Sequence, residues 1–200
     1  MQKFLRKKIA GFGRDRRGVA AVEFAFIAPI MLALYFMTVE AVQGIDTSKQ
    51  LSRLGSMVAD LVGQQDTLTK DALAGIMRVG QTTMRPYNRS SPTITVTGIK
   101  ISKKDYSNLD PKVIWSGKLT NNVYSAGYAK NSVATLPDSM KTDETFLIKV
   151  EINLGYKPII AWASGSEKTT GLTGAFSNIN MNEVYYARPR IRREIACSNC

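Results

Sequence analysis

Residues 16–45, with the sequence RRGVAAVEFAFIAPIMLALYFMTVEAVQGI, decide how this chain is organised. Residues 18–45 contain only two charged side chains, those of Glu23 and Glu40. As a helix they would extend about 42 Å, which exceeds the roughly 30 Å of a bilayer hydrocarbon core. The uncharged part, residues 24–39, would extend only about 24 Å. The helix can therefore span the membrane only if Glu40 lies at one membrane interface and if Glu23 either lies near the other interface or is paired with another charge. Because the run is apolar on every face, it indicates a membrane-spanning helix more than the buried helix of a soluble protein.

The segment before this run is strongly basic. Residues 1–17 contain seven lysine and arginine residues and one aspartate, so they carry +6 of the formal net charge of +11. Such charge beside a spanning helix marks the cytoplasmic side of the membrane. An ordinary secretory signal would end in a small-x-small cleavage site, whereas this apolar run would be retained. We therefore predict a basic cytoplasmic leader at residues 1–18, a transmembrane helix at 19–45 and an exported domain at 46–200.

Glu23 is the anomalous residue of the apolar run. A carboxylate within such a helix is costly and usually has a partner. If a protease cut after Gly18, the new amino terminus at Val19 would make Glu23 the fifth residue of the mature chain. The α-amine of one helix could then pair with the glutamate of a staggered neighbour, and wrong registers would leave a buried charge unpaired. The alternative is that Glu23 lies in the headgroup region.

The start of the apolar run resembles a prepilin-peptidase (class III) signal. Basic residues come first, then Gly18, then the string VAAVEF, in which Glu23 and Phe24 are the fifth and sixth residues after the glycine. The longer string RRGVAAVEFAFIAPIMLAL, with Pro29 inside the helix, resembles the TadE-like family of minor pseudopilins. These proteins belong to the tight-adherence (Flp, type IVc) pilus systems of bacteria. The resemblance implies cleavage directly after Gly18. We assign Glu23 and Phe24 to subunit pairing and Pro29 to a helix kink.

The resemblance also implies a role in pilus assembly and cell adhesion, at initiation or within the fibre and not as the major subunit. The implied partners are the inner membrane, the prepilin peptidase, other pilins or pseudopilins and the pilus assembly platform. Neither nucleic acid nor a small-molecule substrate is expected. The chain would cross the inner membrane once, with its C-terminal domain in the periplasm or outside the cell. The alternative function is an uncleaved single-pass anchor that presents an exported scaffold or adhesion domain of the same system.

The exported part of the sequence predicts helices first and strands afterwards. An amphipathic helix continues over residues 46–62, and a second helix is expected from about Thr69, its N-cap, to Met84. Strands are expected at residues 93–101, 112–118, 146–156 and 181–188. This order predicts an α+β fold, in which a long N-terminal transmembrane and amphipathic helix and a second helix precede a small antiparallel sheet, as in a pilin-like arrangement.

Two parts of the predicted sheet region do not follow a simple alternating pattern. Ile99 and Ile101 would share the face of Ile94 and Val96 only if Gly98 supplied a one-residue bulge. Residues 121–141 have no clear period and are rich in polar residues, so a long surface loop is expected there.

The chemistry of the side chains argues against an enzyme. The sequence contains no histidine, which removes histidine-dependent triads, the commonest zinc sites and the usual general base. Its glycines do not form a phosphate-binding loop, and the adjacent Asp143 and Glu144 are interpreted as a solvated turn. We expect no catalytic residues, no cofactor and no metal.

Two features of the C-terminus remain open. Cys197 and Cys200 could form a small-loop disulfide in an oxidising compartment, remain free or intermolecular thiols, or act in redox catalysis, although no chain follows to form the helix of a redox motif. The basic tail that includes Arg190 and Arg192 could contact anionic lipid or an acidic partner. We favour the interpretation that it is the solvated face of a terminal strand, because Arg188, Arg190 and Arg192 fall at period two.

Overall fold

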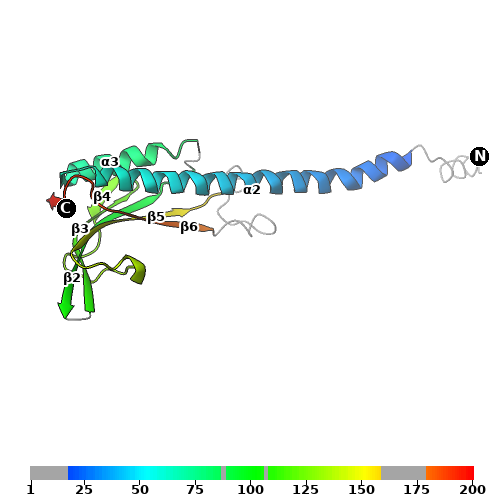
Figure 1. Ribbon diagram of the computed structural model, residues 1–200. Coiled ribbons are helices and arrows are strands. Elements are labelled where there is room, and N and C mark those ends of the chain that lie inside the picture. The colour runs from blue at the N-terminus through cyan, green and yellow to red at the C-terminus, as the bar shows by residue number, and fades with distance from the viewer. Residues whose placement is uncertain (1–17, 87–88, 106–107, 159–178) are drawn as a thin grey trace, which may run out of the picture. The chain divides into compact units, whose positions relative to one another are not determined.

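The computed structural model describes residues 18–86, 89–105, 108–158 and 179–200 (Figure 1). The predicted leader therefore lies outside the described residues, except for Gly18. The chain divides into two compact units, Met1–Gln43 and Gly44–Cys200. Helix α2 (Val19–Gly63, 45 residues) begins in the first unit and ends in the second, and Pro29 lies inside it. The predicted transmembrane and amphipathic stretches are thus parts of one helix.

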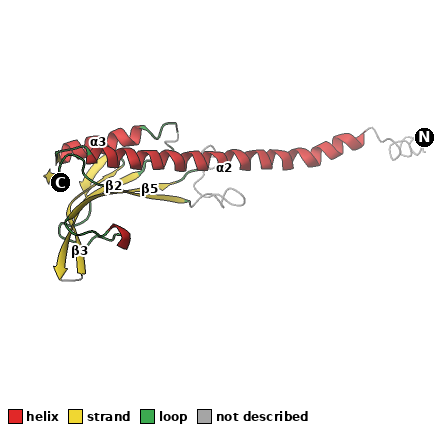
Figure 2. Ribbon diagram, in the orientation of Figure 1, coloured by secondary structure: helices red, strands yellow, loops and turns green. Residues whose placement is uncertain are grey.

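The second unit has the predicted α+β architecture, with helices and strands in separate layers (Figure 2). Its main sheet has five antiparallel strands in the order β4-β3-β2-β5-β6, and a second sheet pairs β1 with β7 in parallel. After α2 the elements are β1 (Thr67–Thr69), α3 (Lys70–Thr82), β2 (Thr93–Asp105), β3 (Asn108–Thr120), β4 (Val123–Ala126), the short 3-10 helix η2 (Asp138–Met140), β5 (Thr145–Gly155), β6 (Asn180–Ala187) and β7 (Ala196–Ser198).

The main core lies between one face of the five-stranded sheet and the two helices, α3 and the C-terminal part of α2 (Figure 1). Small residues allow these layers to approach closely. A Cβ atom on Gly55 of α2 would collide with the ring of Tyr185, and one on Gly80 of α3 would lie 2.6 Å from Cγ2 of Val58. The core combines aliphatic side chains of both helices with the inward residues of β2, β3 and β5, among them Leu51, Leu54, Val58, Leu73, Met77, Ile94, Val96, Trp115, Ile148, Val150 and Ile152.

Helix α3 begins where the capping pattern predicted. The side chain of Thr69 accepts a hydrogen bond of 3.1 Å from the backbone N–H of Ala72, and Asp71 lies in the first turn, where it complements the helix dipole. The helix ends at Thr82, two residues before the predicted end at Met84, whose side chain is nevertheless fully buried.

The condition under which Ile99 and Ile101 would share the face of Val96, a bulge at Gly98, is not met. The pairing of β2 with β5 continues through Gly98 without a shift, so residues of opposite parity point to opposite faces. The register shift occurs against β3, where Ile114 is the extra residue. Ile99 and Ile101 instead form a second, smaller core on the outer face of the sheet, and its other buried members are Leu136 and Leu147.

The expectation of one long surface loop at residues 121–141 is also wrong. Asn121 and Asn122 have φ values of 50° and 64° and connect β3 to β4 in a tight hairpin. Two consecutive positive φ angles match a type I′ turn, whose twist suits paired strands and which asparagine tolerates. Further along, Leu136 is buried in the second core just before η2. Between these elements the chain follows β3, where Val133 forms a β-bridge with Lys112.

Candidate functional site

The first candidate site is the apolar part of α2 in the first unit. Its large side chains are exposed, from 37% for Met37 to 72% for Phe26. Within the described residues, α2 is the one helix long and apolar enough to cross a membrane, judged by length and composition. Leaving this much apolar surface in water costs about 25 cal/mol per Å². The segment is therefore suited to lipid or to the apolar helices of other subunits.

The predicted processing and pairing residues lie together at the start of this helix. Gly18 directly precedes Val19, the first residue of α2, and both are exposed. Val19 and Glu23 are four residues apart, so they share one face of the helix. Glu23 is also exposed, and the Phe24 side chain is 71% exposed. Pro29 lies inside the helix, which continues beyond it.

Neither packing against the described residues nor backbone conformation requires glycine at position 18. A Cβ atom added there would meet no described atom within 4 Å, and its φ lies outside the left-handed region that only glycine adopts readily. The described part of the chain would therefore accept a larger residue at this position.

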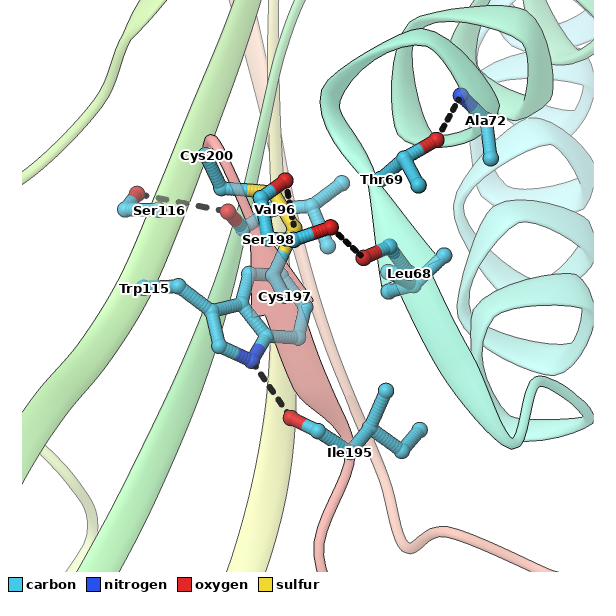
Figure 3. Close-up of a disulfide and its surroundings, with 10 residues drawn as sticks. All are labelled: Leu68, Thr69, Ala72, Val96, Trp115, Ser116, Ile195, Cys197, Ser198 and Cys200. Carbon is cyan, nitrogen blue, oxygen red and sulfur yellow. Dashed lines mark hydrogen bonds between the residues drawn. A yellow bond between two sulfur atoms is a disulfide. The ribbon is translucent and has the colours of Figure 1, made fainter.

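The second candidate site is a C-terminal clasp, defined as residues 188–200 (Figure 3). Strand β7 pairs in parallel with β1, so that Cys197 lies opposite Leu68. The indole Nε1–H of Trp115 donates a buried hydrogen bond of 2.7 Å to the carbonyl oxygen of Ile195. The sulfur atoms of Cys197 and Cys200 are bonded, with the two Cα atoms 5.8 Å apart. These contacts attach the chain end to both the sheet and the segment between the helices.

The arginines of the clasp contact the end of α2 and the turn after it. Arg190 pairs with Asp60, and its backbone N–H donates a hydrogen bond of 2.9 Å to the carbonyl oxygen of Gly63. Arg192 pairs with Asp66. Strand β6 ends at Ala187 and residues 190–194 form bends, so the interpretation of this tail as a solvated strand face is wrong. Exposed ion pairs contribute little individually, and the backbone bond therefore fixes the position more firmly.

The described residues contain no group of three or more histidine, cysteine, aspartate or glutamate side chains that could hold a metal ion. Asp143, interpreted from the sequence as part of a solvated turn, pairs with Lys103 at 2.8 Å. The hydrogen bond from Lys103 lowers the pKa of the Asp143 carboxyl below its ordinary value. This arrangement is an exposed ion pair at the entry to β5.

The comparisons with known proteins bear on the apolar helix. A family model described as TadE-like protein matches residues 18–59, from Gly18 to a point within α2. This N-terminal segment is TadE-like. The match confirms the resemblance predicted from the string that contains Gly18 and Glu23. A search of curated proteins and a search of solved structures each found no match.

The TadE-like segment implies involvement in a tight-adherence pilus system, with other proteins of that system as partners. Proteins of this family are not known as enzymes. The single long apolar helix that carries the segment suggests a single-pass membrane anchor. The clasp, by contrast, lies outside the matched residues and belongs to this chain's own C-terminal half.

Proposed function

We propose that this protein is a minor pseudopilin of a tight-adherence (Flp, type IVc) pilus, processed by a prepilin peptidase between Gly18 and Val19. The observation that carries the proposal is the TadE-like match, which begins at Gly18 and covers the exposed apolar helix. A Cβ atom at position 18 would meet no described atom, and this supports recognition of Gly18 by a peptidase over a role in packing against the described residues.

The proposed topology follows from charge and apolar length. The basic leader, residues 1–18, stays in the cytoplasm, residues 19–45 cross the bacterial inner membrane, and residues 46–200 are exported. Cleavage removes the leader and leaves the helix in place. The exported location is compatible with the disulfide between Cys197 and Cys200, because disulfides persist in oxidising compartments.

Assembly then transfers the apolar helix from lipid to a bundle of pilin helices. In the mature chain the α-amine of Val19 and the carboxylate of Glu23 lie about 6 Å apart along the helix axis, since each residue rises 1.5 Å. A neighbouring helix displaced by about that distance would place its amine beside this carboxylate. An unpaired charge in the bundle is costly, so the pair selects the register in which subunits enter. Phe24, exposed beside Glu23, supplies apolar contact in the same layer.

Cleavage is tested by two substitutions at one position. Gly18→Glu should leave the long form in the membrane, because it replaces the small residue that the peptidase accepts, whereas Gly18→Ala should still be shortened. Immunoblotting of membranes from a host with its own prepilin peptidase distinguishes the two forms. A shortened product from Gly18→Glu, or a long form from the unsubstituted protein, would contradict processing at this site.

Assembly is tested separately at Glu23. Glu23→Gln should insert into the membrane normally but should lower the number of pili, since the amide carries no charge to pair with the α-amine. Glu23→Asp retains the charge and should retain more assembly than Glu23→Gln. Normal pilus number in the Glu23→Gln strain would contradict the pairing. If the chain also stays uncleaved, the function becomes that of a permanent anchor that presents an exported scaffold or adhesion domain.

A further inference from the structure

The outer face of the five-stranded sheet carries a groove that the pseudopilin role does not use. This face points away from α2 and α3, which lie together on the other side of the sheet (Figure 1). The groove has a volume of about 430 Å³ and opens over β2, β5 and β6. It lies beside the second core, so the outer face is apolar near Ile99 and polar farther along β2.

The strand register places the groove's polar side chains in two rows. In one row Thr93 lies opposite Asn153, which lies opposite Asn182. In the next row Thr95 lies opposite Glu151, with Val184 beyond it. The remaining lining residues are Lys118 of β3, Tyr128, which follows β4, Ile152 of β5 and Glu183 of β6. All of these strands belong to one hydrogen-bonded sheet, so the platform is rigid.

The side chains of the first row are positioned by mutual contacts that leave groups free to bind. The Nδ2 amide of Asn153 donates a hydrogen bond to Oδ1 of Asn182. That bond leaves the carbonyl oxygen of Asn153 as an acceptor and the amino group of Asn182 as a donor. Thr93 accepts a hydrogen bond of 3.5 Å from Thr120, which orients its hydroxyl. Donors and acceptors therefore alternate across the floor of the groove.

The charge of Glu151 in the second row is balanced by Lys149 from the adjacent row, which lies opposite Thr97. Lys149 pairs with Glu151 at 2.8 Å, and both side chains are largely buried. Burial raises the pKa of the Tyr128 phenol, and its hydrogen bond to Glu151 raises it further, so the ring remains neutral. Tyr128 is 50% exposed, which leaves part of the ring accessible at the rim of the groove.

These features exclude several ligand classes. The backbone groups of β2 and β5 are used within the sheet, so an extended peptide could not add itself as a further strand over this face. Most of the lining residues are polar, with Ile152 and Val184 as the exceptions, and this does not suit a wholly apolar ligand. The charged lining residues are Lys118, Glu151 and Glu183, and Lys149 pairs with Glu151, so two positive and two negative side chains leave no net charge to select an anion or a cation. A ligand must instead offer many neutral hydroxyl or amide groups to a rigid polar floor.

We propose that this groove binds a neutral oligosaccharide. Vicinal sugar hydroxyls would exchange hydrogen bonds with Thr95, Asn153 and Asn182, and a sugar ring would lie against the exposed part of Tyr128. Each hydroxyl both donates and accepts, which matches the alternation on the floor. The inference rests on the groove alone and holds whether or not the chain is cleaved after Gly18.

The test uses the full chain in lipid nanodiscs without glycoside detergent, so that no sugar headgroup competes. Triacetylchitotriose, cellotriose and maltotriose are titrated separately by isothermal calorimetry and by saturation-transfer NMR. At least one should bind saturably. Thr95→Val, which removes one hydroxyl, and Asn182→Val, which removes one side-chain amide and its hydrogen bond with Asn153, should each weaken that binding by about fivefold or more. Neither side chain is buried, so both variants should fold.

Thr67→Val is the matched control, because Thr67 is an exposed strand residue in β1 that does not line the groove. Its affinity for the saccharide should stay within about twofold of the unsubstituted chain. The proposal is overturned if none of the three saccharides binds, or if Thr67→Val weakens binding as much as Thr95→Val. Saturable binding of a polar peptide together with no saccharide binding would also overturn it.

Discussion

Two glycines of α3 should respond to the same substitution in opposite directions. Gly75 and Gly80 both lie inside the helix, so replacement by alanine gains the same helix propensity, about 0.5–1 kcal/mol at either position. An added Cβ at Gly75 would meet no described atom within 4 Å. Gly75→Ala should therefore raise the free energy of unfolding by about that amount.

At Gly80 a steric cost opposes the gain in propensity. An added Cβ would lie 2.6 Å from Cγ2 of Val58 and 3.6 Å from Cγ of Leu54, both fully buried on α2. Val58 is branched at Cβ and cannot rotate away freely. Overpacking of this kind costs about 1–3 kcal/mol, so Gly80→Ala should range from neutral to about 2 kcal/mol less stable than the unsubstituted protein. The difference between the two variants isolates the overpacking, because their propensity gains cancel.

The assay is urea unfolding of the full chain in nanodiscs, followed by tryptophan fluorescence, because Trp115 lies in the core that α3 covers. Gly80→Ala should unfold at lower urea than Gly75→Ala, with unchanged slope. Val58→Ala should remove the clash, so the double variant should be more stable than the sum of the single effects predicts. Equal stability of Gly75→Ala and Gly80→Ala would refute the described packing of α3 on α2.

Three further predictions concern other parts of the exported unit. Trp115→Phe should lower stability by about 1–3 kcal/mol, because it leaves the buried carbonyl of Ile195 without its donor; unchanged urea unfolding would contradict this. Asn122→Val should destabilise the hairpin by about 1–2 kcal/mol, because a β-branched residue resists a φ of 64°; an unaltered thermal midpoint would contradict this. Lys103→Met should raise the pKa of Asp143, measured by carboxyl NMR, towards its ordinary value. The stabilisation from this ion pair is present at pH values above the ordinary pKa of an aspartate and is lost as the pH falls through the lowered pKa. If the pKa of Asp143 is the same in Lys103→Met as in the unsubstituted protein, Lys103 is not the cause of the lowered pKa.

Local periodicity was sufficient to predict the elements that bury a single regular face. Strand β5 alternates from Phe146 to Leu154, and the structure places these residues in the main core. The N-cap at Thr69 was also predictable, because its cause lies within one turn of the chain. The apolar run of α2 was recognisable for the same reason, since its character is visible residue by residue.

Features that depend on distant segments were not predictable. Ile99 is buried on the outer face because residues around Leu136 cover it, and no local pattern in β2 reveals that cover. Strands β1 and β7 have three residues each, too few to show a period, and they pair across more than half of the chain. The Asn121–Asn122 turn did carry a usable signal, because two adjacent asparagines suit the two positive φ angles of a tight hairpin.

The candidate sites also contain parts that short-range patterns indicate and parts that depend on distant segments. Gly18 and Glu23 were predicted from spacing, because a peptidase signal and a helix face are both short-range patterns, and their roles in processing and pairing stay predictions. The clasp was not found, because Trp115 and Ile195 are 80 residues apart and the partners of Arg190 lie at the end of α2. The spacing of the two cysteines left three outcomes open, and the structure contains the bonded form.

The central claim is that the chain is shortened after Gly18 before it functions. The most direct measurement is the intact mass of the protein purified from membranes of its native host. We predict a mass below the 22.1 kDa of the full chain by the mass of residues 1–18, with Val19 as the amino-terminal residue. A full-length mass in cells that contain an active prepilin peptidase would contradict the account and make the protein a permanent anchor.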